Sequence, residues 1–160
     1  MKNVDVDVKI FSARYEELDE ADRRLIDVAK EATTRSYAPY SRFSVGAAVR
    51  LANGVTLSGS NQENAAYPSG TCAERTTLFY ANSQYPDQAV ECLAIAARNE
   101  SDFVDTPIPP CGACRQVILE TEQRFRRPIR ILLFGREVIY VMEGIGNLLP
   151  LSFGIQFLSV

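Results

Sequence analysis

The feature that most constrains this chain is a pair of short cysteine-bearing stretches, TCAER at 71–75 and PCGACR at 110–115, which hold three of its four cysteines. Cys111 and Cys114 are three residues apart behind a proline. If a helix begins at Cys111, both thiols lie on one face of its first turn. Cys72 lies 39 residues before Cys111, where we also expect a helix to begin. The fold must therefore bring two helix starts together if these thiols share a partner.

Three thiols at two helix starts indicate a zinc centre. Zinc–thiolate bonds of about 2.3 Å in a tetrahedron separate neighbouring sulfurs by roughly 3.7 Å, which a helical i,i+3 pair can supply. The fourth cysteine, Cys92, lies in the apolar run at 89–97 and is predicted to be a small residue of a buried strand. The chain contains no histidine. With Cys72, Cys111 and Cys114 as ligands, the fourth position stays open for water, as in catalytic rather than structural zinc sites.

Charged residues beside the cysteines complete the predicted site. Glu74, two residues after Cys72, is the candidate base beside the water. Arg75 and Arg115 are candidates to donate hydrogen bonds to the sulfurs, which would offset the negative charge of three thiolates. We expect Arg75 to matter more, because it directly follows Glu74.

Hydrophobic periodicity and turn residues predict an α/β chain. Asp19 is the expected N-cap of the first helix, and the second helix is expected to direct Leu78, Phe79 and Ala81 inward. This order of elements predicts a three-layer α/β/α sandwich with a mixed five-stranded sheet. Helices are expected at about 20–32, 72–83 and 111–123, and strands at about 43–51, 55–60, 89–97, 129–134 and 137–142.

The 160 residues predict a single domain, 1–160. Residues 4–11 alternate apolar and polar side chains, typical of an edge strand or an extended arm that serves either packing or subunit contact. The amino-terminal segment lacks the apolar core of a signal peptide, and no apolar run reaches the length of a membrane span, so we expect a cytoplasmic protein. Four cysteines then predict thiols or metal ligands rather than disulfides. The net charge of −3 gives no electrostatic reason to bind nucleic acid.

The stretches TCAER at 71–75 and PPCGACRQV at 109–117 resemble the zinc-dependent cytidine deaminases of the small homotetrameric type. Zinc deaminases carry an H-x-E…P-C-x-x-C signature, and Cys72 stands here in place of the histidine, as in the three-cysteine variant. The resemblance covers a core at 15–153, between an arm at 1–14 and an apolar tail at 154–160. It implies a cytidine deaminase-like fold, one zinc ion per subunit and active sites shared between subunits of a homotetramer.

Further residues are candidates for substrate binding. Asn61 and Glu63 are two apart, so in an extended segment their side chains share one face and suit a diol; the resemblance assigns them to the ribose hydroxyls. It also places Phe43 and Ala73 in the nucleoside pocket, and Phe153, in the NLLPLSFG ending, on the base bound by a neighbouring subunit. Considered without the resemblance, either phenylalanine would be an ordinary core or interface residue.

The predicted reaction is zinc-dependent hydrolytic deamination of cytidine and deoxycytidine to uridine and deoxyuridine, with release of ammonia, as in pyrimidine salvage. Two alternatives stay open. One is a deaminase of another aminopyrimidine compound, such as a nucleoside antibiotic, which would share the zinc motifs. The other is a non-catalytic structural zinc module with Cys92 or another group as fourth ligand. A nucleic-acid-editing role is disfavoured by the acidic charge balance.

Overall fold

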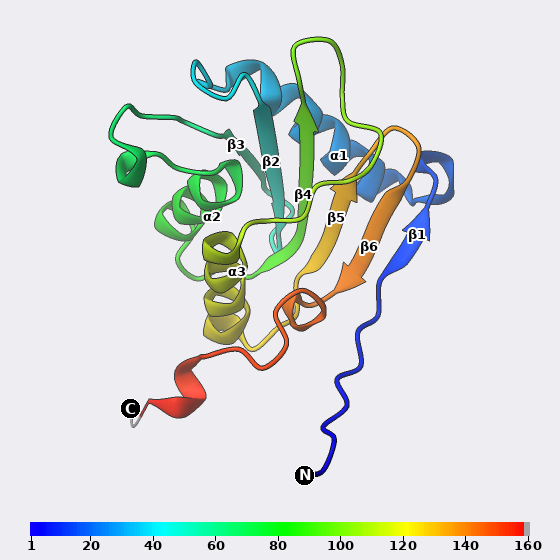
Figure 1. Cartoon of the computed structure of the whole chain (residues 1–160), viewed down its shortest axis with the longest axis vertical. Coiled ribbons are helices and arrows are strands. Elements are labelled where there is room, and N and C mark those ends of the chain that lie inside the picture. The colour runs from blue at the N-terminus through cyan, green and yellow to red at the C-terminus, as the bar shows by residue number, and fades with distance from the viewer. Residues whose placement is uncertain (159–160) are drawn as a thin grey trace.

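A six-stranded mixed sheet forms the middle layer of the fold (Figure 1). The computed structural model describes residues 1–158. The strands follow the order β1-β6-β5-β4-β2-β3 across the sheet. Neighbouring strands run antiparallel except for β4 and β5, which are parallel. The strands are β1 Phe11–Ala13, β2 Ser44–Leu51, β3 Thr56–Ser60, β4 Val90–Arg98, β5 Arg130–Phe134 and β6 Ile139–Glu143.

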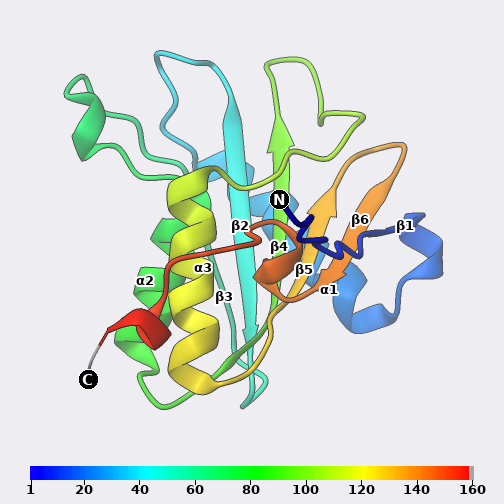
Figure 2. The same ribbon diagram turned by 60° about the horizontal axis from the view of Figure 1, so that its bottom comes forward.

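Helices cover both faces of the sheet. One face is covered by α1 (Glu20–Ala32), and the other by α2 (Ala73–Gln84) and α3 (Gly112–Phe125), as Figures 1 and 2 show. The central strand β4 is buried along most of its length, as expected for a strand with helices on both sides. The predicted three-layer α/β/α architecture is therefore confirmed. Within residues 1–158, no helix is both long and apolar enough to cross a membrane.

The first helix begins where the sequence predicts. The Asp19 carboxylate accepts a hydrogen bond from the backbone N–H of Asp22 at 2.8 Å, which satisfies one donor of the first turn. The helix then packs closely on β2 at Gly46, where a Cβ atom would lie only 2.1 Å from the backbone oxygen of Ala29. A side chain at this position would push α1 away from the sheet.

The predictions for α2 are partly wrong. Leu78 and Ala81 are buried as expected, but Phe79 is 54% exposed. Because one residue advances about 100° around a helix, Phe79 lies beside the buried stripe rather than on it. The prediction for Phe79 considered its apolar character but not its angular position around the helix.

The sheet contains one strand more than the five predicted. Residues 11–13 form β1, which pairs antiparallel with β6 through Phe11–Val141, Ser12–Tyr140 and Ala13–Ile139. Residues 1–10 are outside regular structure. The alternation at 4–11 therefore marks an arm with a strand at its end. A strand of three residues is too short for side-chain periodicity to locate its bounds.

Candidate active site

The helices α2 and α3 begin side by side at the two cysteine-bearing stretches. Cys72 is the N-cap of α2 and Cys111 is the N-cap of α3, both with extended backbone. Cys114 follows in the first turn of α3. Because the N-terminus of a helix carries a partial positive charge, both helix starts favour negatively charged sulfur at this point.

The three sulfurs form a compact cluster. The Sγ atoms of Cys72 and Cys111 are 3.8 Å apart, and those of Cys111 and Cys114 are 3.5 Å apart. All three lie within 4.8 Å of one another. These separations are close to the roughly 3.7 Å of neighbouring thiolates around a tetrahedral zinc ion, and thiolate is a preferred zinc ligand. The donor set therefore fits zinc.

Cys92 is not part of this cluster. It is fully buried in β4, among the apolar residues that pack beneath α1. Its thiol lies 3.8 Å from the carboxylate of Asp22, and burial raises its pKa. All four cysteines have free thiols. A fourth sulfur from Cys92, which a closed structural zinc module would require, is therefore held in the core as a neutral thiol.

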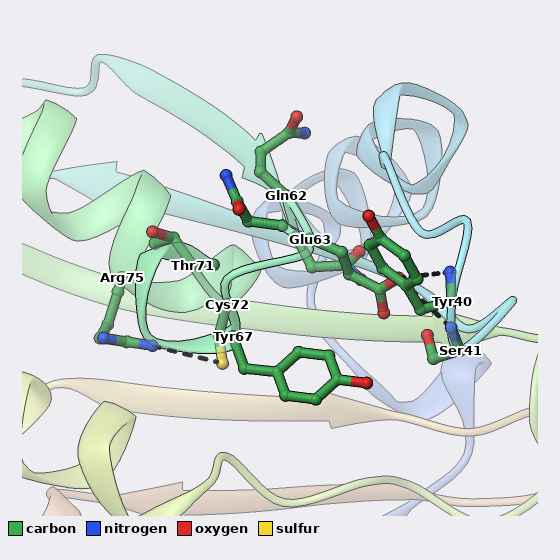
Figure 3. Close-up of a pocket in the computed structure, with 11 residues that line it drawn as sticks. Tyr40, Ser41, Gln62, Glu63, Tyr67, Thr71, Cys72 and Arg75 are labelled. Carbon is green, nitrogen blue, oxygen red and sulfur yellow. Dashed lines mark hydrogen bonds between the residues drawn. The ribbon is translucent and has the colours of Figure 1, made fainter.

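Arg75 lies beside the sulfur cluster, on the first turn of α2. Its Nη2 donates a hydrogen bond to the Cys72 sulfur at 3.8 Å (Figure 3). Hydrogen bonds from Cys114 and Arg75 lower the pKa of Cys72 to about 5, so this sulfur is a thiolate at neutral pH. The Cys114 thiol donates a hydrogen bond to the Cys72 sulfur. This bond, together with burial, raises the pKa of Cys114.

Arg115, the second arginine predicted to contact the sulfurs, has different partners. Its Nε donates to the backbone oxygen of Pro110 at 2.8 Å, and its Nη1 to that of Leu148 at 2.6 Å. Arg115 thus ties the loop that precedes α3 to the chain after β6. This contact supports the backbone that carries Cys111, and it does not place the guanidinium on a sulfur.

Glu74 is buried next to the sulfurs, with 4% of its surface exposed. Burial raises the pKa of this carboxyl group, and the charge of Cys72 adds to the increase. A carboxylate that is shielded from solvent and has an increased affinity for protons is suited to take up a proton and return it.

A cavity of about 510 Å³ opens beside Cys72. Cys72 and Arg75 lie at one end and Glu63 at the other (Figure 3). Two tyrosines meet edge-to-face at its mouth, Tyr40 and Tyr67, with ring centroids 6.5 Å apart. The sequence did not mark either tyrosine as a functional residue, beyond the fact that Tyr67 lies in the stretch NQENAAYPSG at 61–70. The lining consists of Tyr40, Ser41, Asn61, Gln62, Glu63, Asn64, Tyr67, Gly70, Thr71, Cys72 and Arg75.

The Glu63 carboxylate faces this cavity and anchors a neighbouring loop. Its Oε2 accepts hydrogen bonds from the backbone N–H groups of Tyr40 at 2.9 Å and Ser41 at 3.2 Å. Hydrogen bonds lower the pKa of Glu63, and the bond from the Ser41 side chain contributes most. The carboxylate is therefore ionised at neutral pH, and its two oxygens retain the capacity to accept another hydrogen bond.

The hydrogen-bonding groups of the Asn61 side chain are more fully used within the protein than the sequence suggested. Its Oδ1 accepts hydrogen bonds from the backbone N–H of Val45 at 2.8 Å and from the Ser36 hydroxyl at 2.6 Å. Its Nδ2 donates to the backbone oxygen of Phe43 at 3.0 Å. Both acceptor positions of the amide are used, so one N–H remains for a ligand. Asn61 therefore orients the start of β2 and has only a donor to offer a substrate.

We expect Asn61→Ala to lower the free energy of unfolding by about 1–3 kcal/mol, because it leaves partly buried polar groups without partners. Urea denaturation followed by circular dichroism measures the change. Asn64→Ala is the matched control: among residues 1–158 its exposed side chain bonds only the nearby Ala66 N–H, at 2.8 Å, so a much smaller change is expected. Equal losses in the two variants would contradict the anchoring role of Asn61.

The remaining predicted substrate-binding residues do not line this cavity. Phe43 is half-buried just before β2, and Ala73 is buried at the first position of α2. Phe153 is 61% exposed on the carboxyl-terminal segment, where its ring stacks on Phe157 with centroids 5.9 Å apart. The role of Phe153 in a neighbouring subunit stays a prediction.

With this geometry established, comparison with known proteins identifies the family. Residues 19–127 match the family described as "Cytidine and deoxycytidylate deaminase zinc-binding region". A cytidine deaminase of Halalkalibacterium halodurans is 45% identical over 96 residues, which are 60% of this chain and 68% of that protein. A Mycobacterium tuberculosis cytidine deaminase is 34% identical over 131 residues, which are 80% of this chain and 86% of that protein.

A solved structure agrees with the sequence comparison. The crystal structure of cytidine deaminase from Burkholderia pseudomallei superposes with a TM-score of 0.70 at 37% identity, covering 81% of this chain and 97% of that one. The family match spans α1 to α3 and includes the sulfur cluster and Glu74. This chain belongs to the cytidine and deoxycytidylate deaminase family, and the cysteine cluster lies within its zinc-binding region.

Proposed function

We propose that this protein hydrolyses cytidine and deoxycytidine to uridine and deoxyuridine and releases ammonia. The observation that carries the proposal is the buried Glu74 beside three clustered thiols, one of which, Cys72, lines a cavity that also presents Glu63. The similar proteins of H. halodurans and M. tuberculosis, named cytidine deaminases, support it. The net charge of −3 favours small nucleosides over nucleic acids as substrates.

Cys72, Cys111 and Cys114 would hold one zinc ion per subunit. When bound, zinc supplies Lewis acidity that makes water a nucleophile near neutral pH. Arg75 keeps a positive charge beside the Cys72 thiolate, 3.8 Å from its sulfur, and so offsets part of the negative charge of the ligands.

Glu74 moves the protons of the reaction. It accepts a proton from the water that attacks C4 of the pyrimidine and delivers it to ring N3. It then transfers the remaining hydroxyl proton to the exocyclic amine, the C4–N bond breaks, and ammonia leaves as the C4 carbonyl forms. Because Glu74 is buried, solvent water does not compete for these protons. The first backbone N–H groups of α2, beginning at Ala73, have no partner within the helix and would donate hydrogen bonds to the reacting group.

The sugar would bind at the other end of the cavity. The Glu63 carboxylate would accept a hydrogen bond from a sugar hydroxyl, and the remaining N–H of Asn61 would donate one. The base would pack against Phe43 and, in a homotetramer, against Phe153 of a neighbouring subunit. This assembly, together with a cytoplasmic role in pyrimidine salvage, completes the proposal.

Ammonia release from cytidine by the zinc-loaded protein tests the reaction. Deoxycytidine should also react, whereas free cytosine should react poorly because it lacks the sugar that Glu63 binds. A protein that released no ammonia from either nucleoside would refute the proposal. Release from another aminopyrimidine nucleoside alone would favour the related activity on a nucleoside antibiotic.

Phe153→Ala is expected to raise the KM for cytidine by about 5- to 150-fold and to change kcat less, because loss of one aromatic contact with a base costs about 1–3 kcal/mol. Steady-state ammonia release measures both constants. Phe157→Ala is the control, because Phe157 is also exposed and stacks on Phe153. A KM that is unchanged in Phe153→Ala would place this residue outside the substrate site.

A further inference from the structure

The amino-terminal arm, residues 1–10, extends from β1 past the end of the sheet (Figure 1). Four apolar side chains at its even-numbered positions are exposed: Val4 to 75%, Val6 to 46%, and Val8 and Ile10 to 44% each. They occupy every second position, so in an extended arm they share one face. The arm also precedes the family match, which begins at residue 19. Neither the fold of one subunit nor the proposed reaction accounts for this apolar face.

The backbone of the arm has one side free. The N–H of Lys9 donates to the Asn147 side chain at 2.8 Å, toward the body of the subunit. Because N–H groups alternate sides along an extended strand, those of Val8 and Ile10 point away from the body. Within residues 1–158, Lys9 supplies the only backbone hydrogen bond of the arm. The arm continues into β1, which is an edge strand, so an unpaired edge runs from the arm along the sheet.

The arm sequence is complementary to itself. In an antiparallel pair with a two-fold axis at Val8, the residues opposite each other have numbers that add to 16. Val8 then faces Val8 and Val6 faces Ile10, so apolar side chains meet on one face. On the other face Asp7 faces Lys9, and the symmetry repeats that pair. A two-fold interface requires such self-complementarity.

We infer that residues 4–12 pair in antiparallel fashion with the same segment of a second copy of this chain. The pairing lays residues 4 and 5 of each arm along the β1 edge of the other chain and satisfies the outward N–H and C=O groups of the even-numbered residues. It also gives Val6, Val8 and Ile10 an apolar neighbour across the pair. The opposed Asp7 and Lys9, which already lie 3.3 Å apart within one chain, set the register.

Cysteine cross-linking tests the register directly. In the zinc-loaded full chain, Val8→Cys places two thiols on the two-fold axis. Opposed Cα atoms of such a hydrogen-bonded pair are about 5.5 Å apart, within the range of about 4.4–6.8 Å that a disulfide spans. Val4→Cys is the matched control, because its partner is Ser12. Under mild oxidation we expect a covalent dimer of Val8→Cys and none of Val4→Cys or the parent. Cross-linking of both variants alike, or of neither, would overturn the inference.

A charge cycle tests the same contact without new thiols. Asp7→Lys should raise the dissociation constant measured by analytical ultracentrifugation by about tenfold, because like charges then face each other twice. The double variant D7K/K9D should restore parental association. Asp5→Lys should not change it, because Asp5 faces Phe11. Failure of the double variant to restore association would contradict the pairing. Both readouts are independent of deaminase activity, so this inference can fail while the proposed reaction holds.

Discussion

Replacing Glu74 by glutamine is expected to reduce kcat for ammonia release from cytidine by about 10²–10⁴-fold, the contribution of general acid–base catalysis. The amide has the shape of the carboxylate but takes up no proton from water. Zinc content should be unchanged, because the three sulfurs are untouched. Turnover on cytidine, with zinc determined by mass spectrometry on the same sample, measures the effect.

The melting temperature of this variant distinguishes the loss of the catalytic base from a loss of folding. Burial raises the pKa of Glu74 above its value in the unfolded chain, so the folded state disfavours the ionised form and loses stability as the pH rises through that pKa. Glutamine removes this cost, so the melting temperature at neutral pH should be equal or higher. Glu120→Gln, at an exposed position of α3, is the control and should retain full activity. A Glu74→Gln variant with near-parental turnover would rule out Glu74 as the base.

Cys111→Ala is expected to weaken zinc binding by more than about 100-fold, the upper range for removal of a ligand's supporting partner. It removes the sulfur that lies 3.8 Å from Cys72 and 3.5 Å from Cys114. Activity should fall with the metal content. The melting temperature should fall as well, because metal binding stabilises the folded state. Competition with a chromophoric chelator measures the affinity.

Cys92→Ala is the matched control for this change. It removes a thiol from the core beneath α1 rather than from the sulfur cluster. It should lower stability modestly and leave zinc content unchanged. If Cys92→Ala lost its zinc, a closed four-thiolate site would be supported. Full zinc occupancy in Cys111→Ala would refute the proposed ligand set.

The amino-acid sequence was sufficient to predict the features that depend on local spacing. Two cysteines three apart at a helix start place both thiols on one turn, and the structure brings Cys72 to the same point. Asp19 caps α1 because a short acidic side chain bonds the first-turn N–H groups regardless of what packs nearby. The architecture followed from the order of periodic segments, since helices and strands of this pattern must bury one face each.

The prediction was weakest where a residue's role depends on partners that are distant in the sequence. Arg115 neighbours the cysteines in sequence, yet its guanidinium donates to Pro110 and Leu148. The Asn61 amide is of a type that binds sugar hydroxyls, but Ser36, Phe43 and Val45 occupy most of its hydrogen-bonding capacity. A side chain's bonding capacity is limited, and only the packed chain decides which groups use it.

The sequence by itself therefore determined the Cys111–Cys114 pair and the carboxylate two residues after Cys72, because each rests on spacing within one turn of helix, and the tertiary structure joined them into one cluster. The tertiary structure alone decided that β1 joins the sheet, that Tyr40 and Tyr67 meet at the mouth of the cavity, and that the amino-terminal arm keeps an unpaired edge. Those features are contacts between distant segments. Their energies depend on how the whole chain packs, which no local pattern encodes.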